Sequence, residues 1–202
     1  MNSARLWVAR ERREGKLRKR HVGQAMLWFA LYRLGKTGME ETVRTAVRSL
    51  EGLPEAELRA RSLEFWTEEL VSKVRRAVPD VLAAHQRQGD LRVLLSGTSA
   101  QLAAACAAHF GLDGALSTTF EVADGLFTGR TEEPLCYGAG KLHHATQFAD
   151  QHGITLDQCS FYTDSYSDLP MLEAVGTPVV VDPDRRLLRK AQRRGWQVAD
   201  WD

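Results

Sequence analysis

The sequence predicts an α/β protein in which an all-helical N-terminal segment precedes a sheet of parallel strands. Apolar residues recur at helical spacing from residue 3 to about residue 88. From residue 91 onward, short apolar runs alternate with helical segments, which is typical of a parallel sheet covered by helices. With 44% hydrophobic and 26% charged residues, the 202-residue chain is expected to fold around one principal core, and disordered and fibrous classes are excluded.

The N-terminal segment is predicted to contain five or six helices. Its breaks are expected at Gly15, at residues 35–38, at residues 52–54 and at residues 78–80, where Gly and Pro interrupt the pattern. Pro54 and Thr37 are residues suited to helix starts. We expect a domain boundary near residues 80–90, which divides the chain into residues 1–80 and 81–202.

The first predicted strand covers residues 91–95, a compact apolar run after Gly89 and Asp90. It leads into Ser96-Gly97-Thr98-Ser99 and then into an alanine-rich helix at residues 100–110, which Gly111 ends. Residues 115–122 and 126–129 flank Ala123-Asp124-Gly125. An Asp-Gly pair supplies the positive φ angles of a tight turn, so this segment predicts a β-hairpin.

The rest of the chain alternates helices with strands. The predicted elements are a helix at 141–152, a strand at 159–163, a short helix at 169–174, a strand at 178–181 and a basic helix at 184–194. Ligands of such sheets bind beyond the carboxyl ends of the strands. We therefore expect the chemistry in the loops after Leu95, Thr163 and Val181.

Targeting and cysteine signals favour a cytoplasmic protein. The three cysteines show no C-x-x-C pattern and no metal-ligand spacing with His, so neither a disulfide framework nor a zinc site is indicated. The longest apolar run, residues 25–32, is much shorter than the roughly 20 residues that a membrane-spanning helix needs. No signal peptide is evident.

Asp164 and Asp168 form the strongest local signal for a functional site. They lie four residues apart directly after the predicted strand 159–163. Carboxylates in such a place suit Mg²⁺, which prefers oxygen ligands. The alternative is that Asp168 caps the following helix and Asp164 closes a turn.

Two further segments could bind phosphate. Ser96, Gly97 and Thr98 offer a hydroxyl and backbone N–H groups at a helix start, although an ordinary helix cap has the same appearance. Lys141 opens a helix after Gly138 and Gly140. The segment is not a phosphate-binding loop of the G-x-x-x-x-G-K-[ST] type, and a lysine there is otherwise a solvated surface residue.

In this order, the three segments resemble the second, third and fourth motifs of the haloacid dehalogenase superfamily. Three features resemble its phosphoserine-phosphatase-like branch (subfamily IB): helices before the second motif, the Ser96-Gly97-Thr98 form of that motif, and residues 163–172 in the fourth. The hairpin followed by Gly140-Lys141 is similar as well. The resemblance covers about residues 3–202.

The resemblance implies a Rossmann-like parallel core (residues 81–202) with an N-terminal helical cap (residues 1–80). It implies a phosphomonoester hydrolase that transfers the phosphoryl group to an aspartate with Mg²⁺ as cofactor. Ser96, Gly97 and Thr98 would hold the phosphate, and Lys141 would neutralise it. Asp164 would bind Mg²⁺. Asp168 would complete the acidic and catalytic site. It would either contact a metal-bound water or orient Lys141 or the loop of the fourth motif.

The family's first motif, D-x-D-x-T after the first central strand, is not present in residues 1–202. That motif supplies the nucleophile, so we expect the sheet to lack this strand and the polypeptide to be inactive by itself. Residues 2–7 resemble the segment that follows the motif in this branch. The favoured interpretation is a start assigned too far downstream, and the alternative is a true, catalytically silent truncation.

The charge distribution leaves other functions open. Residues 1–20 contain eight Lys and Arg against Glu11 and Glu14, although the whole chain has a net charge of only +1. A solvated cap face is the favoured interpretation, and peripheral contact with an anionic membrane is the alternative. The expected substrate is an amino-acid phosphate or a lysophospholipid-type phosphate, and nucleic acid is not expected. A non-catalytic phosphate-binding protein and a basic membrane- or nucleic-acid-associated module are the rival functions, and the sequence does not indicate the oligomeric state.

Overall fold

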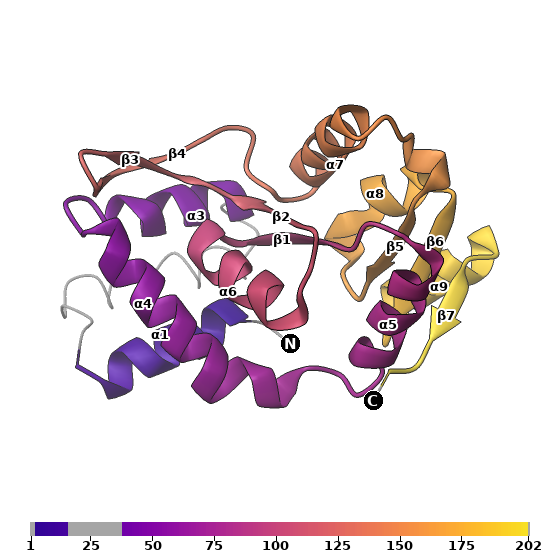
Figure 1. The fold of residues 1–202 in the computed structure, drawn as a ribbon, viewed down its shortest axis with the longest axis horizontal. Coiled ribbons are helices and arrows are strands. Elements are labelled where there is room, and N and C mark those ends of the chain that lie inside the picture. Colours follow the sequence, from indigo (N-terminus) through magenta and orange to yellow (C-terminus); the bar gives the residue numbers. More distant parts are fainter. Residues whose placement is uncertain (1–2, 16–37, 202) are drawn as a thin grey trace.

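A computed structural model describes residues 3–15 and 38–201 of the chain. The predicted apolar helix around residues 25–32, the helix start at Thr37 and the basic residues 16–20 lie outside these ranges. The described residues form a mixed α/β structure with small parallel sheets and helices at the N-terminal side. In Figure 1 the N-terminal helices gather at one end of the molecule, and the C-terminal strands lie at the other.

The N-terminal part is helical, as the periodicity predicts. It contains α1 (Ser3–Arg13), α3 (Met39–Arg48) and α4 (Glu55–Phe65), and α4 continues into a π-helical turn, η1 (Trp66–Leu70), and a 3-10 turn, η2 (Val71–Lys73). Pro54 is the N-cap residue of α4 and has an extended backbone, as predicted from its sequence position. Gly15 follows α1 with a φ of 66°.

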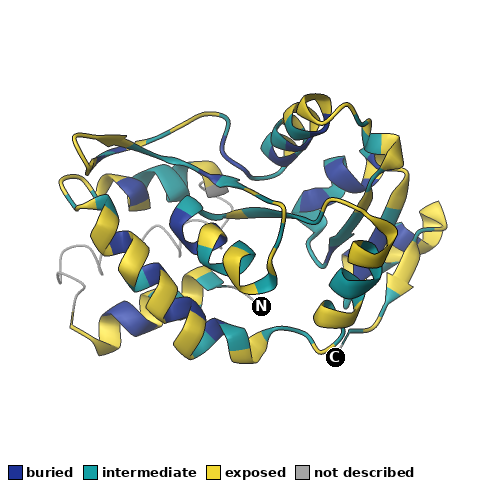
Figure 2. Ribbon diagram, viewed as in Figure 1, coloured by how far each residue is buried: buried dark blue, intermediate teal, exposed yellow. Residues whose placement is uncertain are grey.

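Aromatic packing holds α1 against α4. The rings of Trp7 and Phe65 meet edge to face with centroids 5.1 Å apart, and Phe65 is fully buried. Trp66, Leu70 and Leu102 complete this cluster, so the helical part also packs on the helix α6 that follows the first strand. Figure 2 shows the buried residues of these helices on the sides that face one another.

The first pair of parallel strands follows the helix α5 (Val78–Gln88). The predicted domain boundary between residues 80 and 81 falls within this helix. The pair consists of β1 (Val93–Ser99) and β2 (Gly114–Thr118), joined by α6 (Ala100–Phe110). The prediction ended the strand at Leu95, whereas β1 continues to Ser99. The reason is that Ser99 pairs with Thr118 after an irregularity in the register.

The predicted hairpin is confirmed as β3 (Phe120–Ala123) and β4 (Leu126–Thr131), an antiparallel pair. Asp124 and Gly125 have φ angles of 51° and 76°, as the tight turn requires. The predicted single strand 115–122 is divided in two because its first half pairs with β1 and its second half with β4. The hairpin reaches back to the helical part, where Gly52 N–H donates to the Phe127 carbonyl at 2.9 Å.

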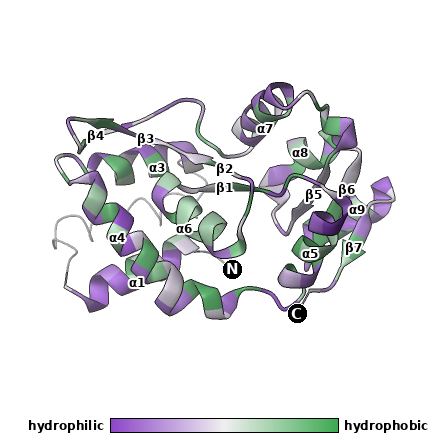
Figure 3. Ribbon diagram, viewed as in Figure 1, coloured by the Kyte–Doolittle hydropathy of each residue, from purple (hydrophilic) through white to green (hydrophobic). Residues whose placement is uncertain are grey.

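The second parallel sheet has the order β5-β6-β7. Its elements are α7 (Ala139–Gln151), η3 (Leu156–Gln158), β5 (Ser160–Thr163), η4 (Tyr166–Asp168), α8 (Leu169–Ala174), β6 (Thr177–Val181), α9 (Arg185–Arg194) and β7 (Gln197–Ala199). The sequence did not predict β7, since it has only three residues and two of them are exposed. Figure 3 shows α9 as a largely hydrophilic helix, and its Leu187 and Ala191 are buried against β6.

Among the described residues, β1 and β5 are not hydrogen-bonded to each other, so the parallel strands form two sheets. The two sheets share one apolar cluster, however. Leu95 from β1 and Phe161 from β5 both pack against Ala145, Met171 and Val175, which come from α7 and the α8 region. Thus α7 and α8 connect the two halves of the core.

No helix in residues 3–15 or 38–201 has both the length and the apolar character needed to cross a membrane.

Replacement of Phe65 by Ala should lower the free energy of unfolding by about 3–5 kcal/mol, because it empties a fully buried aromatic site between α1 and α4. Leu63→Ala is the control, because Leu63 on the same helix is 54% exposed. Urea denaturation followed by circular dichroism measures both. A loss below about 1 kcal/mol for the Phe65 variant would show that the α1–α4 contact is not part of the core.

Candidate functional site

Lys141, Asp168 and Thr163 form a buried polar cluster at the carboxyl end of β5. Lys141 Nζ lies 2.7 Å from Asp168 Oδ2, and Thr163 Oγ1 donates to the same oxygen at 2.7 Å. The side chains of Asp168 and Lys141 are only 3% and 11% exposed. A buried charge is tolerated when it is paired and hydrogen-bonded, which this arrangement achieves.

Local chain geometry places each member of the cluster. Thr163 is the last residue of β5, and its hydroxyl also accepts from the Ser165 N–H at 3.1 Å. The turn η4 then brings Asp168 back over Thr163. Lys141 lies in the first turn of α7. Gly140 precedes it because a Cβ at that position would collide with the Leu135 carbonyl oxygen.

The segment Ser96-Gly97-Thr98 lies within the last part of β1. The hydroxyl that caps α6 belongs to Ser99, which accepts from the Leu102 N–H at 3.3 Å. The helix-cap interpretation therefore does not apply to Ser96, whose Oγ accepts from the Thr98 N–H at 3.3 Å. Gly97 is exposed at this carboxyl end of β1.

Cys136 lies beside Gly97, and no feature of the sequence indicated it as a site residue. It is fully buried, and its carbonyl oxygen lies 3.2 Å from the position that a Cβ of Gly97 would take. Burial raises the pKa of its thiol to about 11, whereas the Lys141 charge and the Ser96 backbone act in the opposite direction. The backbone of Cys136, five residues before Lys141 in the sequence, thus lies against Gly97.

Asp164 is not part of this cluster. Its Oδ2 lies 2.7 Å from Arg75 Nη2, and the same guanidinium pairs with Asp182 through Nε at 2.6 Å. Sequence reasoning missed Arg75, because an arginine in the connection after η2 has no local signal that distinguishes it from its exposed neighbour Arg76. Thr163 was likewise missed, although its place at the end of a strand could have indicated it.

The predicted Mg²⁺ ligands, Asp164 and Asp168, do not fit a shared metal site as the chain is folded. Asp168 Oδ2 is occupied by Lys141 and Thr163, and Asp164 Oδ2 is occupied by Arg75. In the part of the chain that the structure describes, no group of three or more His, Cys, Asp and Glu side chains is arranged to hold a metal ion.

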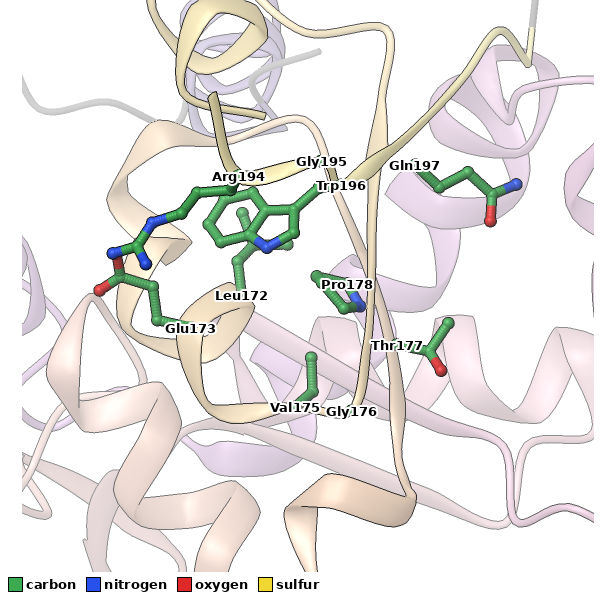
Figure 4. Close-up of a pocket in the computed structure, with 10 residues that line it drawn as sticks. All are labelled: Leu172, Glu173, Val175, Gly176, Thr177, Pro178, Arg194, Gly195, Trp196 and Gln197. Atoms are coloured by element: carbon green, nitrogen blue, oxygen red, sulfur yellow. The ribbon is translucent and has the colours of Figure 1, made fainter. Parts of the chain in front are cut away.

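Two cavities lie outside the polar cluster. One of about 450 Å³ is at the amino ends of β6 and β7, opposite the predicted site, and Figure 4 shows Trp196 over Leu172 and Arg194 reaching toward Glu173. The Arg194–Glu173 distance is 2.9 Å. The other, of about 380 Å³, lies beside β2 and α7 and is lined in part by Ser117, His143 and His144.

The sequence profile of the haloacid dehalogenase-like hydrolases matches residues 2–173. The chain belongs to this family. Phosphoserine phosphatase SerB1 of Mycobacterium tuberculosis (strain ATCC 25618 / H37Rv) is 37% identical over 171 residues, which are 83% of this chain and 56% of that protein. A histidinol-phosphatase of Neisseria meningitidis serogroup C (strain 8013) is 30% identical over 68% of this chain and 64% of its own length.

A solved structure shows the same fold across the whole chain. A protein of unknown function from Bordetella pertussis Tohama I has a TM-score of 0.90 and 29% identity, with 100% of this chain and 93% of that chain covered. The HAD-like fold and the phosphoserine-phosphatase-like kinship predicted from the sequence are therefore confirmed. The chain spans little more than half the length of the Mycobacterium relative.

Thr163→Val should lower the free energy of unfolding by about 1–3 kcal/mol, because it removes the hydroxyl between Asp168 Oδ2 and the Ser165 N–H at nearly constant volume. Thr177→Val is the matched control, since Thr177 is an exposed strand residue on the neighbouring β6. Urea denaturation gives both values. Equal stability of the two variants would contradict a structural role for the Thr163 hydroxyl.

Proposed function

We propose that the chain provides the phosphate site of a hydrolase of small phosphomonoesters, in which Ser96, Gly97, Thr98 and Lys141 bind the phosphate. The observation that carries the proposal is the buried Lys141 ammonium, which Asp168 holds at the carboxyl end of β5. The Cys136 carbonyl, five residues before Lys141, lies against Gly97 at the carboxyl end of β1. A phosphoryl group is anionic, and its transfer depends on positioned cations and N–H donors. Family membership supports this assignment.

In this proposal Lys141 and Asp168 have distinct roles. Lys141 neutralises the negative charge of the phosphate, and Asp168 orients the ammonium through the 2.7 Å contact between Lys141 Nζ and Asp168 Oδ2. Ser96 donates its hydroxyl proton to a phosphate oxygen, and the phosphate can approach the backbone closely at Gly97, which is exposed, with Thr98 beside it.

We also propose that residues 1–202 by themselves bind phosphate without turnover. The sequence has two Asp-x-Asp pairs that follow strands, Asp182 with Asp184 and Asp200 with Asp202. Arg186 stands where the motif needs Thr after the first pair, and no Thr follows the second pair in residues 1–202. Asp184 accepts from the Arg186 and Leu187 N–H groups as the N-cap of α9, and Asp182 is paired with Arg75. The separation of β1 from β5 supports the proposal that a central strand carrying the nucleophile is needed between them.

The substrate proposed is a phosphorylated small alcohol such as an amino-acid phosphate, and we propose that the helical cap, residues 1–80, selects it. The two relatives, a phosphoserine phosphatase and a histidinol-phosphatase, support this class over a lysophospholipid phosphate. A basic membrane- or nucleic-acid-binding function receives less support from the described part of α1. There Arg10 pairs with Glu14 and Glu68, and Arg13 pairs with Glu69.

Isothermal titration of the purified 202-residue chain with inorganic phosphate tests the phosphate site, and p-nitrophenyl phosphate and phosphoserine assays test turnover. We expect phosphate binding and no hydrolysis above the background rate. Lys141→Met should weaken phosphate binding by about 10- to 100-fold, as expected for the loss of a charge-assisted hydrogen bond. Ser96→Ala is a milder second variant.

Lys73→Met is the control, because it removes the same charge from an exposed lysine at the end of η2. Circular dichroism establishes that each variant is folded. Phosphate binding that is unaffected by both site variants would contradict the proposed site. The unmodified 202-residue chain could instead hydrolyse the substrates, with Lys141→Met abolishing this activity. That result would contradict the need for a further nucleophile.

A further inference from the structure

A bulge interrupts β1 at the segment to which we assign phosphate binding. Between the pairs Leu95–Leu116 and Ser99–Thr118, β1 advances by four residues and β2 by only two. The extra residues lie around Gly97 and leave the regular ladder of the two strands. A backbone carbonyl outside the ladder needs another partner, and the Gly97 carbonyl accepts from Thr118 Oγ1 at 3.4 Å.

Thr118 joins this bulge to the segment that leads to Lys141. Its hydroxyl also accepts from the Cys136 N–H at 3.3 Å, so the same oxygen donates to one segment and accepts from the other. Thr118 is 2% exposed and Cys136 is fully buried, so the hydroxyl and the Cys136 N–H have little access to water. One buried hydroxyl therefore ties the two segments together.

Two close backbone approaches hold the same segment on either side. A Cβ on Gly97 would lie 3.2 Å from the Cys136 carbonyl oxygen, and a Cβ on Gly140 would collide with the Leu135 carbonyl oxygen. Leu135 and Cys136 therefore contact the bulge of β1 through one glycine and the residue before Lys141 through another. A displacement of Cys136 would be transmitted to both.

We propose that Thr118 is a positioning residue of the phosphate site, whose hydroxyl holds the bulge at residues 96–98 and the segment before Lys141 in one arrangement. The proposal rests on the proposed function, which assigns the bulge and Lys141 to the phosphate. Donors that are already in place bind an anion more tightly than donors that must be ordered on binding. Loss of the Thr118 hydroxyl would leave the Gly97 carbonyl and the Cys136 N–H without this partner and so loosen both segments at once.

Isothermal titration of the purified 202-residue chain with inorganic phosphate tests this role. Thr118→Val removes the hydroxyl at nearly constant volume and should weaken phosphate binding at least about fivefold. Thr118→Ser keeps a hydroxyl at this position and should bind within about twofold of the unmodified chain. Thr119→Val is the matched control, because it makes the same exchange at the adjacent, half-buried residue between β2 and β3, and it should leave the affinity unchanged. A hydroxyl with a merely structural role would change the stability and not the phosphate affinity of the folded protein.

Backbone order parameters from ¹⁵N relaxation give a second readout, which does not require phosphate. In Thr118→Val they should fall from about 0.85, the value of rigid backbone, to about 0.7 or below at Gly97, Thr98 and Cys136. In Thr119→Val they should equal those of the unmodified chain. If the unmodified chain binds no phosphate, the proposed function fails, whereas a fall of the order parameters in Thr118→Val alone still supports the role of Thr118 in ordering both segments.

Three results would each overturn the proposal. They are equal phosphate affinity of Thr118→Val and Thr119→Val, failure of Thr118→Ser to bind like the unmodified chain, and order parameters at Gly97 and Thr98 that do not change in Thr118→Val. If Thr118→Val does not fold, the unmodified chain decides. Phosphate should then slow amide hydrogen exchange at Cys136 at least about fivefold, although Cys136 is not a proposed phosphate ligand, and unchanged exchange would overturn the proposal.

Discussion

The contact between Lys141 and Asp168 is the interaction on which the arrangement of the core depends. Neither charge can be buried without the other, since desolvation of a single ion is costly. Lys141 opens α7, which packs on β1 and β2, whereas Asp168 begins α8, which packs on β6. One buried ion pair therefore fixes a helix of the first parallel pair against the loops of the second sheet, although the two sheets share no strand-to-strand hydrogen bonds in the described residues.

The need to pair a buried charge with an opposite one also explains the charge distribution elsewhere in the molecule. Basic residues of α1 that looked like an excess of positive charge in the sequence lie against acidic residues of α4 and η1. Arg10, whose side chain is 9% exposed, has carboxylates from both segments around it. Arg75 satisfies two carboxylates at the sheet edge in a similar way. Local charge counts along the sequence could not show this matching, because the partners of Arg10 and Arg75 in these pairs are 54 to 107 positions away.

Most elements could be predicted from the sequence because their signals are local. Gly111 ends α6 in the left-handed conformation, and the Asp124-Gly125 pair forms the expected hairpin turn. The elements that escaped prediction depend on partners. The extension of β1 to Ser99 requires Thr118 opposite it, and β7 exists only because β6 lies beside it. For the site, strand ends indicated Ser96 and Asp168, and a helix start indicated Lys141. The cations paired with Asp164 and Asp168 come from distant segments, which the sequence could not show.

A double-mutant cycle between Lys141 and Asp168 tests the central claim most directly. The free energy of unfolding is measured by urea denaturation for Lys141→Met, Asp168→Asn and the double variant. Breaking a buried pair from one side should cost about 3–5 kcal/mol, whereas removing both charges should cost much less than the sum. We predict a coupling energy of at least about 2 kcal/mol. Additive losses, with a coupling energy near zero, would contradict the claim that this pair holds the two halves of the core together.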